Sequence, residues 1–76
     1  MSHSQNKVER LRRLAASCLN VPEEEITPDT GVGRHPKWDS MAHVSVILAI
    51  EQEFGVQADE ALMNCRSITE LAEQLP

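Results

Sequence analysis

The hydrophobic positions along this chain of 76 residues recur with the spacing of helices. Over residues 5–19, 40–54 and 67–75, apolar side chains return every three or four positions, as on one face of a helix. A further apolar piece, residues 61–64, is too short to form a stable helix without packing. The pattern predicts an all-α fold, a small four-helix bundle with three main helices and a short third helix.

Polar residues and glycine mark the ends of these helices. Asp39 stands where its carboxylate can accept hydrogen bonds from the first turn of the second helix, and Gly55 is a natural C-terminal stop. The segment Ser67-Ile-Thr-Glu70 is a capping box that opens the last helix. Pro22 ends the first. We therefore expect the second helix to begin at Ser40.

Residues 21–38 lack periodicity and are rich in proline, glycine and charge, which predicts a long loop between helices 1 and 2. Thr27 and Pro28 suggest one helical turn within it. The three glutamates at 23–25 could bind a divalent cation weakly, but consecutive carboxylates cannot converge on one ion, which favours a solvated turn. Three apolar residues are expected to pin the loop to the core, namely Val21, Ile26 and Val32.

The second predicted helix has two apolar sectors rather than one. At about 100° per residue, one sector contains Val46, Ile47, Ile50 and Phe54. Met41, Val44 and Leu48 fall on nearly the opposite side. Because so short a chain has a single core, we expect the second sector to be partly exposed, where a partner or a tethered chain could lie. The alternative is that the loop or the short third helix covers it.

Ser40 is predicted to be the first residue of this helix, with an uncovered hydroxyl. A helix N-terminus carries partial positive charge and unpaired N–H groups, so it would stabilise a phosphate esterified to that hydroxyl. Trp38 and His43 are placed to stack across the helix start, which would leave His43 a half-buried histidine with satisfied nitrogens. The position suits a serine that is modified rather than one that attacks.

The sequence offers no convincing catalytic or metal site. Ser40 has no G-x-S-x-G pattern around it, and no strand precedes it. The three histidines, His3, His35 and His43, show no metal-ligand spacing with the cysteines. Cys18 and Cys65 are expected to be small core residues, with a disulfide as the alternative.

Seven basic residues against twelve acidic ones give a formal charge of −5. An acidic chain argues against nucleic acid as a partner and favours basic protein surfaces. The basic residues at 7–13 could form a docking patch or, as we favour, a solvated helix face. No apolar run is long enough for a membrane span. We expect one domain over residues 1–76, monomeric and cytoplasmic.

Asp39-Ser40-Met41, followed by Val44, Leu48 and a helix that ends in Glu51, Glu53-Phe54-Gly55, resembles the D-S-[L/M] motif and following helix of acyl and peptidyl carrier proteins. The similarity covers nearly the whole chain. In that family the serine receives a 4′-phosphopantetheine arm from coenzyme A, added by a phosphopantetheinyl transferase, and the arm's thiol carries acyl or aminoacyl groups as thioesters.

The resemblance implies that Ser40 is the attachment site and that Asp39 positions it and contacts the transferase. It also implies a partner-binding surface, which comprises Met41, Val44, Leu48, Glu51 and Glu53. Further implied partners are a loading ligase or transferase and downstream pathway enzymes. Such a carrier is not itself an enzyme.

The chain departs from housekeeping fatty-acid carriers near the motif. Ala42 and Ser45 stand where those carriers often have acidic residues, and Trp38 gives the W-D-S variant of many specialised carriers. A stand-alone carrier for a dedicated pathway is therefore expected. Two alternatives are an unmodified helical adaptor, which would bind a partner through the same apolar stripe, and a small metal-binding module, for which no ordered carboxylate set is evident.

Overall fold

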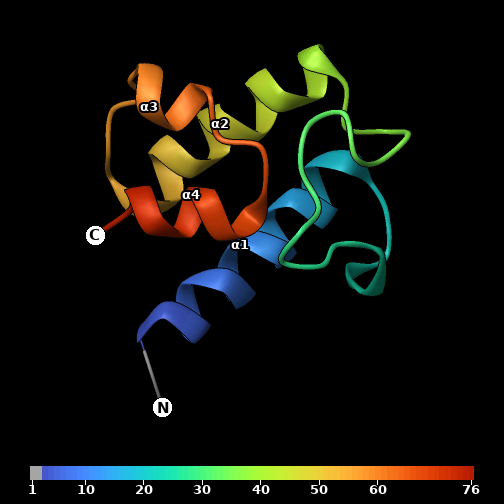
Figure 1. Ribbon diagram of the computed structural model, residues 1–76, viewed down its shortest axis with the longest axis horizontal. Coiled ribbons are helices and arrows are strands. Elements are labelled where there is room, and N and C mark those ends of the chain that lie inside the picture. Colours follow the sequence, from blue (N-terminus) through green and yellow to red (C-terminus); the bar gives the residue numbers. More distant parts are fainter. Residues whose placement is uncertain (1–2) are drawn as a thin grey trace.

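The computed structural model describes residues 3–76 and shows helices joined by turns and one long loop (Figure 1). The helices are α1 (His3–Leu19), α2 (Ser40–Phe54), α3 (Glu60–Met63) and α4 (Ile68–Gln74), with a 3₁₀ helix, η1 (Glu23–Glu25), in the α1–α2 loop. No strand occurs within residues 3–76. The predicted all-α fold of three longer helices and a short third one is confirmed.

Local capping explains where α2 begins and ends. The Asp39 side chain accepts a hydrogen bond from the Ala42 backbone N–H, 2.9 Å away. Gly55 takes the left-handed conformation (φ 64°) that lets its own N–H and that of Val56 return to the Glu51 carbonyl. Both predicted boundaries of α2 are confirmed. They could be predicted from the sequence because each depends on hydrogen bonds between residues a few positions apart.

The capping box before α4 is also present, in a modified form. The Ser67 hydroxyl accepts from the Glu70 N–H at 3.1 Å. The Glu70 carboxylate accepts in return from the Arg66 N–H at 3.0 Å, one residue before the expected donor. Asp59 caps α3 by accepting from the Leu62 N–H.

The core is almost entirely aliphatic and lies where α1 packs against both α2 and α4. Trp38, from the end of the α1–α2 loop, is completely buried in it. Cys65 is buried as predicted, but the prediction for Cys18 is wrong, since that side chain is exposed. Ala15 and Ala16 provide the close contact instead, both buried on α1. Neither cysteine forms a disulfide.

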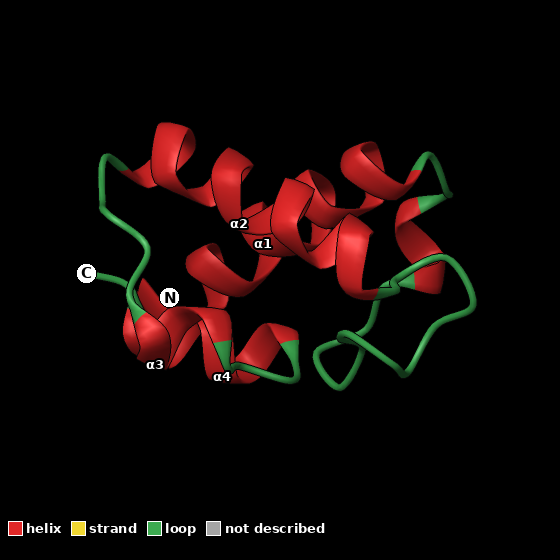
Figure 2. Cartoon of the chain, turned by 90° about the horizontal axis from the view of Figure 1, so that it is seen from above, coloured by secondary structure: helices red, strands yellow, loops and turns green. Residues whose placement is uncertain are grey.

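The α1–α2 loop lies at one end of the molecule, opposite the C-terminus (Figures 1 and 2). The helical turn expected at Thr27 is not found. A helical turn occurs five residues earlier, at Glu23–Glu25, whose side chains are exposed as expected of a solvated turn. At Thr27 the Thr30 N–H donates to the Thr27 carbonyl and closes a turn, and the Thr27 N–H donates to the Thr30 hydroxyl. The predicted apolar pins are confirmed, with Ile26 fully buried and Val21 and Val32 packed against the core.

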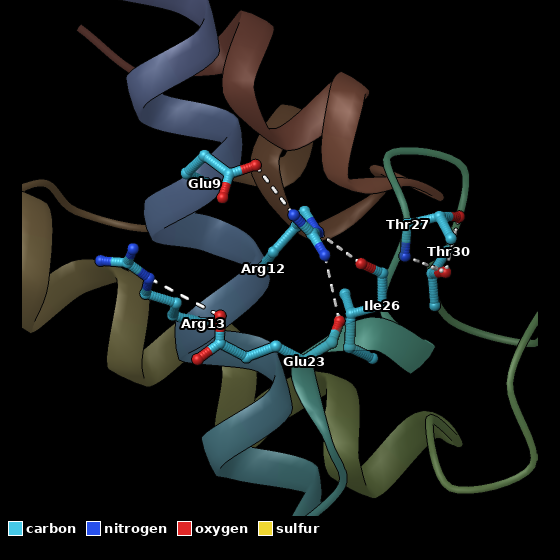
Figure 3. A network of polar contacts seen from close by, with 7 residues as sticks. All are labelled: Glu9, Arg12, Arg13, Glu23, Ile26, Thr27 and Thr30. Carbon is cyan, nitrogen blue, oxygen red and sulfur yellow. Dashed lines mark hydrogen bonds and ion pairs between the residues drawn. The ribbon is translucent and has the colours of Figure 1, made fainter.

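Basic side chains of α1 hold this loop and the end of α4, so they are not simply a solvated face. Arg12 donates to the backbone carbonyls of Ile26 and Glu23 and pairs with Glu9 (Figure 3). Lys7 donates to the Leu75 carbonyl at 2.8 Å. The two guanidinium bonds from Arg12 to the loop replace water that those carbonyls would otherwise bind.

Candidate functional site

Ser40 is exposed at the first position of α2. The neighbouring cap uses the Asp39 carboxylate for the Ala42 N–H. The backbone N–H groups of Ser40 and Met41 have no hydrogen-bond partner among the residues that the structure describes. The hydroxyl is therefore accessible and lies at a helix start whose unpaired donors favour a negative charge.

Trp38 and His43 fix the chain just before this serine. The Trp38 indole N–H donates to His43 Nδ1 at 3.0 Å, with ring centroids 6.0 Å apart and ring planes tilted by 36°. The predicted contact is confirmed, but it is a hydrogen bond between tilted rings rather than a stack. His43 is also buried more deeply than expected, with 6% of its surface exposed. Its second nitrogen, Nε2, lies 2.8 Å from the Met63 carbonyl oxygen.

The backbone of the preceding turn closes on Trp38. The Gly33 N–H donates to the Trp38 carbonyl at 2.9 Å, and the Trp38 N–H donates to the His35 carbonyl at 3.0 Å. Gly33 adopts φ 79°, which a side chain would disfavour. His35 is held in turn by Glu25, at 2.8 Å. Both side-chain and backbone hydrogen bonds thus anchor the segment that leads into Ser40.

The two predicted apolar sectors of α2 are found on opposite faces. Val46, Ile47 and Ile50 are buried in the core. Met41, Val44 and Leu48 expose 82%, 46% and 54% of their surface, so the alternative that the loop or α3 covers them is wrong. We call these three residues the apolar stripe. It begins one residue after Ser40 and follows the same helix.

The two carboxylates of α2 are engaged within the molecule. Glu51 is partly buried and accepts from the Ala58 N–H at 2.8 Å. Glu53 pairs with Arg10 of α1 at 3.0 Å, and the Arg10 guanidinium also lies over the Phe54 ring, 4.3 Å from its centroid. The structure therefore brings Ser40 and the apolar stripe together, but it directs Glu53 toward α1.

The site fits a phosphopantetheine group. The group needs an accessible hydroxyl, donors for its phosphodiester and open space for a long arm, and the start of α2 offers an exposed serine and unpaired N–H groups. Over residues 3–76 there is no cluster of metal-ligating side chains. No helix in that range has the length and hydropathy to cross a membrane.

Comparison with known proteins identifies the class. A family described as "Phosphopantetheine attachment site" matches residues 9–75, and the chain belongs to this family. It is thus a phosphopantetheine-binding carrier protein, which presents bound groups and does not itself catalyse.

The chain is also distantly similar to a curated acyl carrier protein. The acyl carrier protein of Thermosynechococcus vestitus (strain NIES-2133 / IAM M-273 / BP-1) is 27% identical over 67 residues, which cover 87% of this chain and 83% of that protein. No solved structure matches the chain significantly.

Proposed function

We propose that Ser40 carries the 4′-phosphopantetheine arm and that the chain presents acyl or aminoacyl thioesters to the enzymes of a dedicated biosynthetic pathway. The observation that carries this proposal is the exposed serine at the capped start of α2, within the D-S-M motif of a chain that belongs to the phosphopantetheine family. When bound, the arm supplies a thiol, so that intermediates stay tethered and pass between enzymes at high effective concentration.

Asp39 has two tasks in this proposal. Its Oδ1 caps α2, which holds Ser40 at the first helical position. Its other carboxylate oxygen has no hydrogen-bond partner among residues 3–76 and can contact the transferase.

The apolar stripe is the surface on which we expect partner enzymes to dock. Met41, Val44 and Leu48 are exposed beside Ser40. A small exposed apolar surface suits a carrier that must bind several enzymes weakly and briefly. We expect Glu51 and Glu53 to extend this docking surface at the far end of α2. Their intramolecular bonds hold both side chains in place.

The chemistry of this surface favours a specialised pathway over central fatty-acid synthesis. The first ten residues of α2 contain no carboxylate, and Arg34 and Lys37 lie in the loop before the motif. Both of these basic side chains are exposed. Partners would therefore recognise the apolar stripe mainly by shape and burial, and their binding would depend only weakly on salt.

Intact mass before and after incubation with coenzyme A and a broad-specificity phosphopantetheinyl transferase tests the attachment. A gain of one phosphopantetheine that is absent in Ser40→Ala supports the proposal. Ser45→Ala, which changes a second exposed serine of α2, is the matched control and should be modified like the wild type. Modification of Ser40→Ala, or none in the folded wild type, would overturn it.

The exposed stripe alone also suits a second function, that of an unmodified helical adaptor with one permanent partner. The two functions differ at Ser40. A carrier with Ser40→Ala loses all pathway activity while its circular dichroism stays unchanged, whereas an adaptor with the same substitution keeps its activity.

A further inference from the structure

His43 connects three parts of the molecule through two hydrogen bonds. Its Nδ1 accepts from the Trp38 indole at 3.0 Å, and its Nε2 lies 2.8 Å from the carbonyl of Met63. His43 itself belongs to α2, Trp38 ends the α1–α2 loop, and Met63 is the last residue of α3. One buried side chain therefore links the chain before Ser40 to a helix more than twenty residues later.

The hydrogen-bond partners of His43 define which of its ring nitrogens carries the proton. An indole N–H can only donate, so Nδ1 must accept and carries no proton. A carbonyl oxygen can only accept, so Nε2 must carry the proton and donate it to Met63. Both bonds exist together only in the neutral imidazole with its proton on Nε2.

The bond to Met63 holds a helix with little support of its own, and the bond to Trp38 satisfies a buried donor close to Ser40. The helix α3 has only four residues, and so short a helix depends on tertiary contacts. Trp38 lies two residues before Ser40, and its indole N–H is a buried donor whose partner is His43. Loss of that partner would leave the donor unsatisfied in the core and favour displacement of the ring, together with the backbone that leads into the motif.

We propose that His43 is a positioning residue with two separable tasks. Through Trp38 it orients Asp39 and Ser40 for the transferase, and through Met63 it holds α3 against α2. The first task rests on the proposed attachment at Ser40, and the second does not.

Three substitutions separate the tasks. The amide oxygen of asparagine is as many bonds from Cα as Nδ1, so His43→Asn can keep the bond to Trp38. The amide nitrogen of glutamine is as many bonds from Cα as Nε2, so His43→Gln can keep the bond to Met63. His43→Leu removes both. Gln52→Ala, which changes an exposed residue near the other end of α2, is the control.

The measurements are the apparent KM of each apo variant with coenzyme A and a broad-specificity transferase, and hydrogen exchange of the Met63 and Asn64 amides. We expect His43→Leu to raise KM about tenfold with kcat nearly unchanged, because only the fraction with an ordered motif is competent. Its α3 amides should exchange about tenfold faster. Compared with His43→Leu, His43→Asn should return KM to the wild-type value without protecting α3. His43→Gln should restore the protection of the α3 amides without lowering KM.

Long-range ¹⁵N NMR of the wild type should show the Nε2–H tautomer of His43. A proton on Nδ1 would overturn the proposal, as would a folded His43→Leu variant with wild-type KM and exchange. Equal rescue of both readouts by either amide variant would also overturn it, since that indicates general stability. If His43→Leu does not fold, Trp38→Phe removes the donor together with part of the buried ring, and it should raise KM while α3 stays protected. Absence of any mass gain in the wild type would remove the attachment at Ser40 but leave the tautomer and exchange results standing.

Discussion

Gly31 lies directly against the carbonyl of Arg66: a Cβ on Gly31 would stand 1.9 Å from that oxygen. The close approach occurs where the α1–α2 loop meets the start of α4. There the Ile68 N–H donates to the Thr30 carbonyl, at 2.9 Å. Only a residue without a side chain allows the two backbones to come so near.

Gly31→Ala should therefore lower the free energy of unfolding by about 3 kcal/mol, because backbone on both sides cannot move away easily. Gly33→Ala is the control. Its Cβ would meet nothing within 4 Å, so it bears only the cost of φ 79°, about 1 kcal/mol. Urea unfolding followed by circular dichroism measures both. If Gly31→Ala lowered the free energy of unfolding no more than Gly33→Ala, the loop backbone at Gly31 would not lie against the carbonyl of Arg66.

Arg12 should contribute more stability than its neighbour Arg13. Arg12→Ala leaves the Ile26 carbonyl without its donor and removes one of two donors from the Glu23 carbonyl, which keeps the Ile26 N–H. We expect a loss of about 1 to 3 kcal/mol. Arg13 is exposed and only pairs with Glu23 at 3.6 Å, so Arg13→Ala should change stability by about 0.5 kcal/mol or less. Chemical denaturation compares the two. Equal losses would contradict a specific bond between Arg12 and the loop.

Asp39 can be tested for its two tasks separately. Asp39→Ala removes the cap and should cost about 1 kcal/mol, whereas Asp39→Asn keeps an oxygen acceptor and should cost only a few tenths. If the carboxylate contacts the transferase, phosphopantetheine transfer should be slow in both variants. Thermal unfolding and timed intact-mass assays give the two readouts. Wild-type transfer to Asp39→Asn would show that capping is the whole role of this residue.

Leu48 and Ile47 are adjacent but face opposite environments, with 54% and 2% of their surfaces exposed. Ile47→Ala should destabilise the fold by about 2 to 5 kcal/mol, since it leaves a core cavity. Leu48→Ala should change stability by about 0.5 kcal/mol or less. With a cognate loading enzyme, Leu48→Ala should raise KM. A normal KM would place docking elsewhere than on the apolar stripe.

Burial raises the pKa of the Cys65 thiol, and the nearby carboxylates of Glu70, Glu73 and Asp59 raise it further. In the unfolded chain the thiol ionises at lower pH than in the folded one, so ionisation favours unfolding. The stability should therefore be fully present below the ordinary thiol pKa of about 8.5 and decline as the pH rises above it. Urea midpoints at pH 7.5 and 10 measure this. Cys65→Ala should show a smaller decline, and an equal one would exclude the thiol as its source.

Much of the fold follows from short-range features of the sequence. Helical periodicity and the caps at Asp39, Gly55 and Ser67 are local, and the structure confirms each of them. The two sectors of α2 also follow from periodicity alone, because 3.6 residues per turn place Ile47 and Leu48 on different faces. Cys18 shows the limit of this reasoning. Its spacing places it with the apolar residues of α1, yet it is exposed, whereas Ala15 and Ala16 are buried.

The chain's sequence by itself determined the helices, their capped ends and an exposed serine beside an apolar stripe, since these depend on residues a few positions apart. Only the tertiary structure decided which groups meet across the chain: Arg12 with the loop carbonyls, Glu53 with Arg10, Gly31 with Arg66, and His43 with Met63. Such contacts depend on how helices pack and on where a long loop settles. No local periodicity encodes that, because each partner is distant in sequence and its role appears only when the core brings it near.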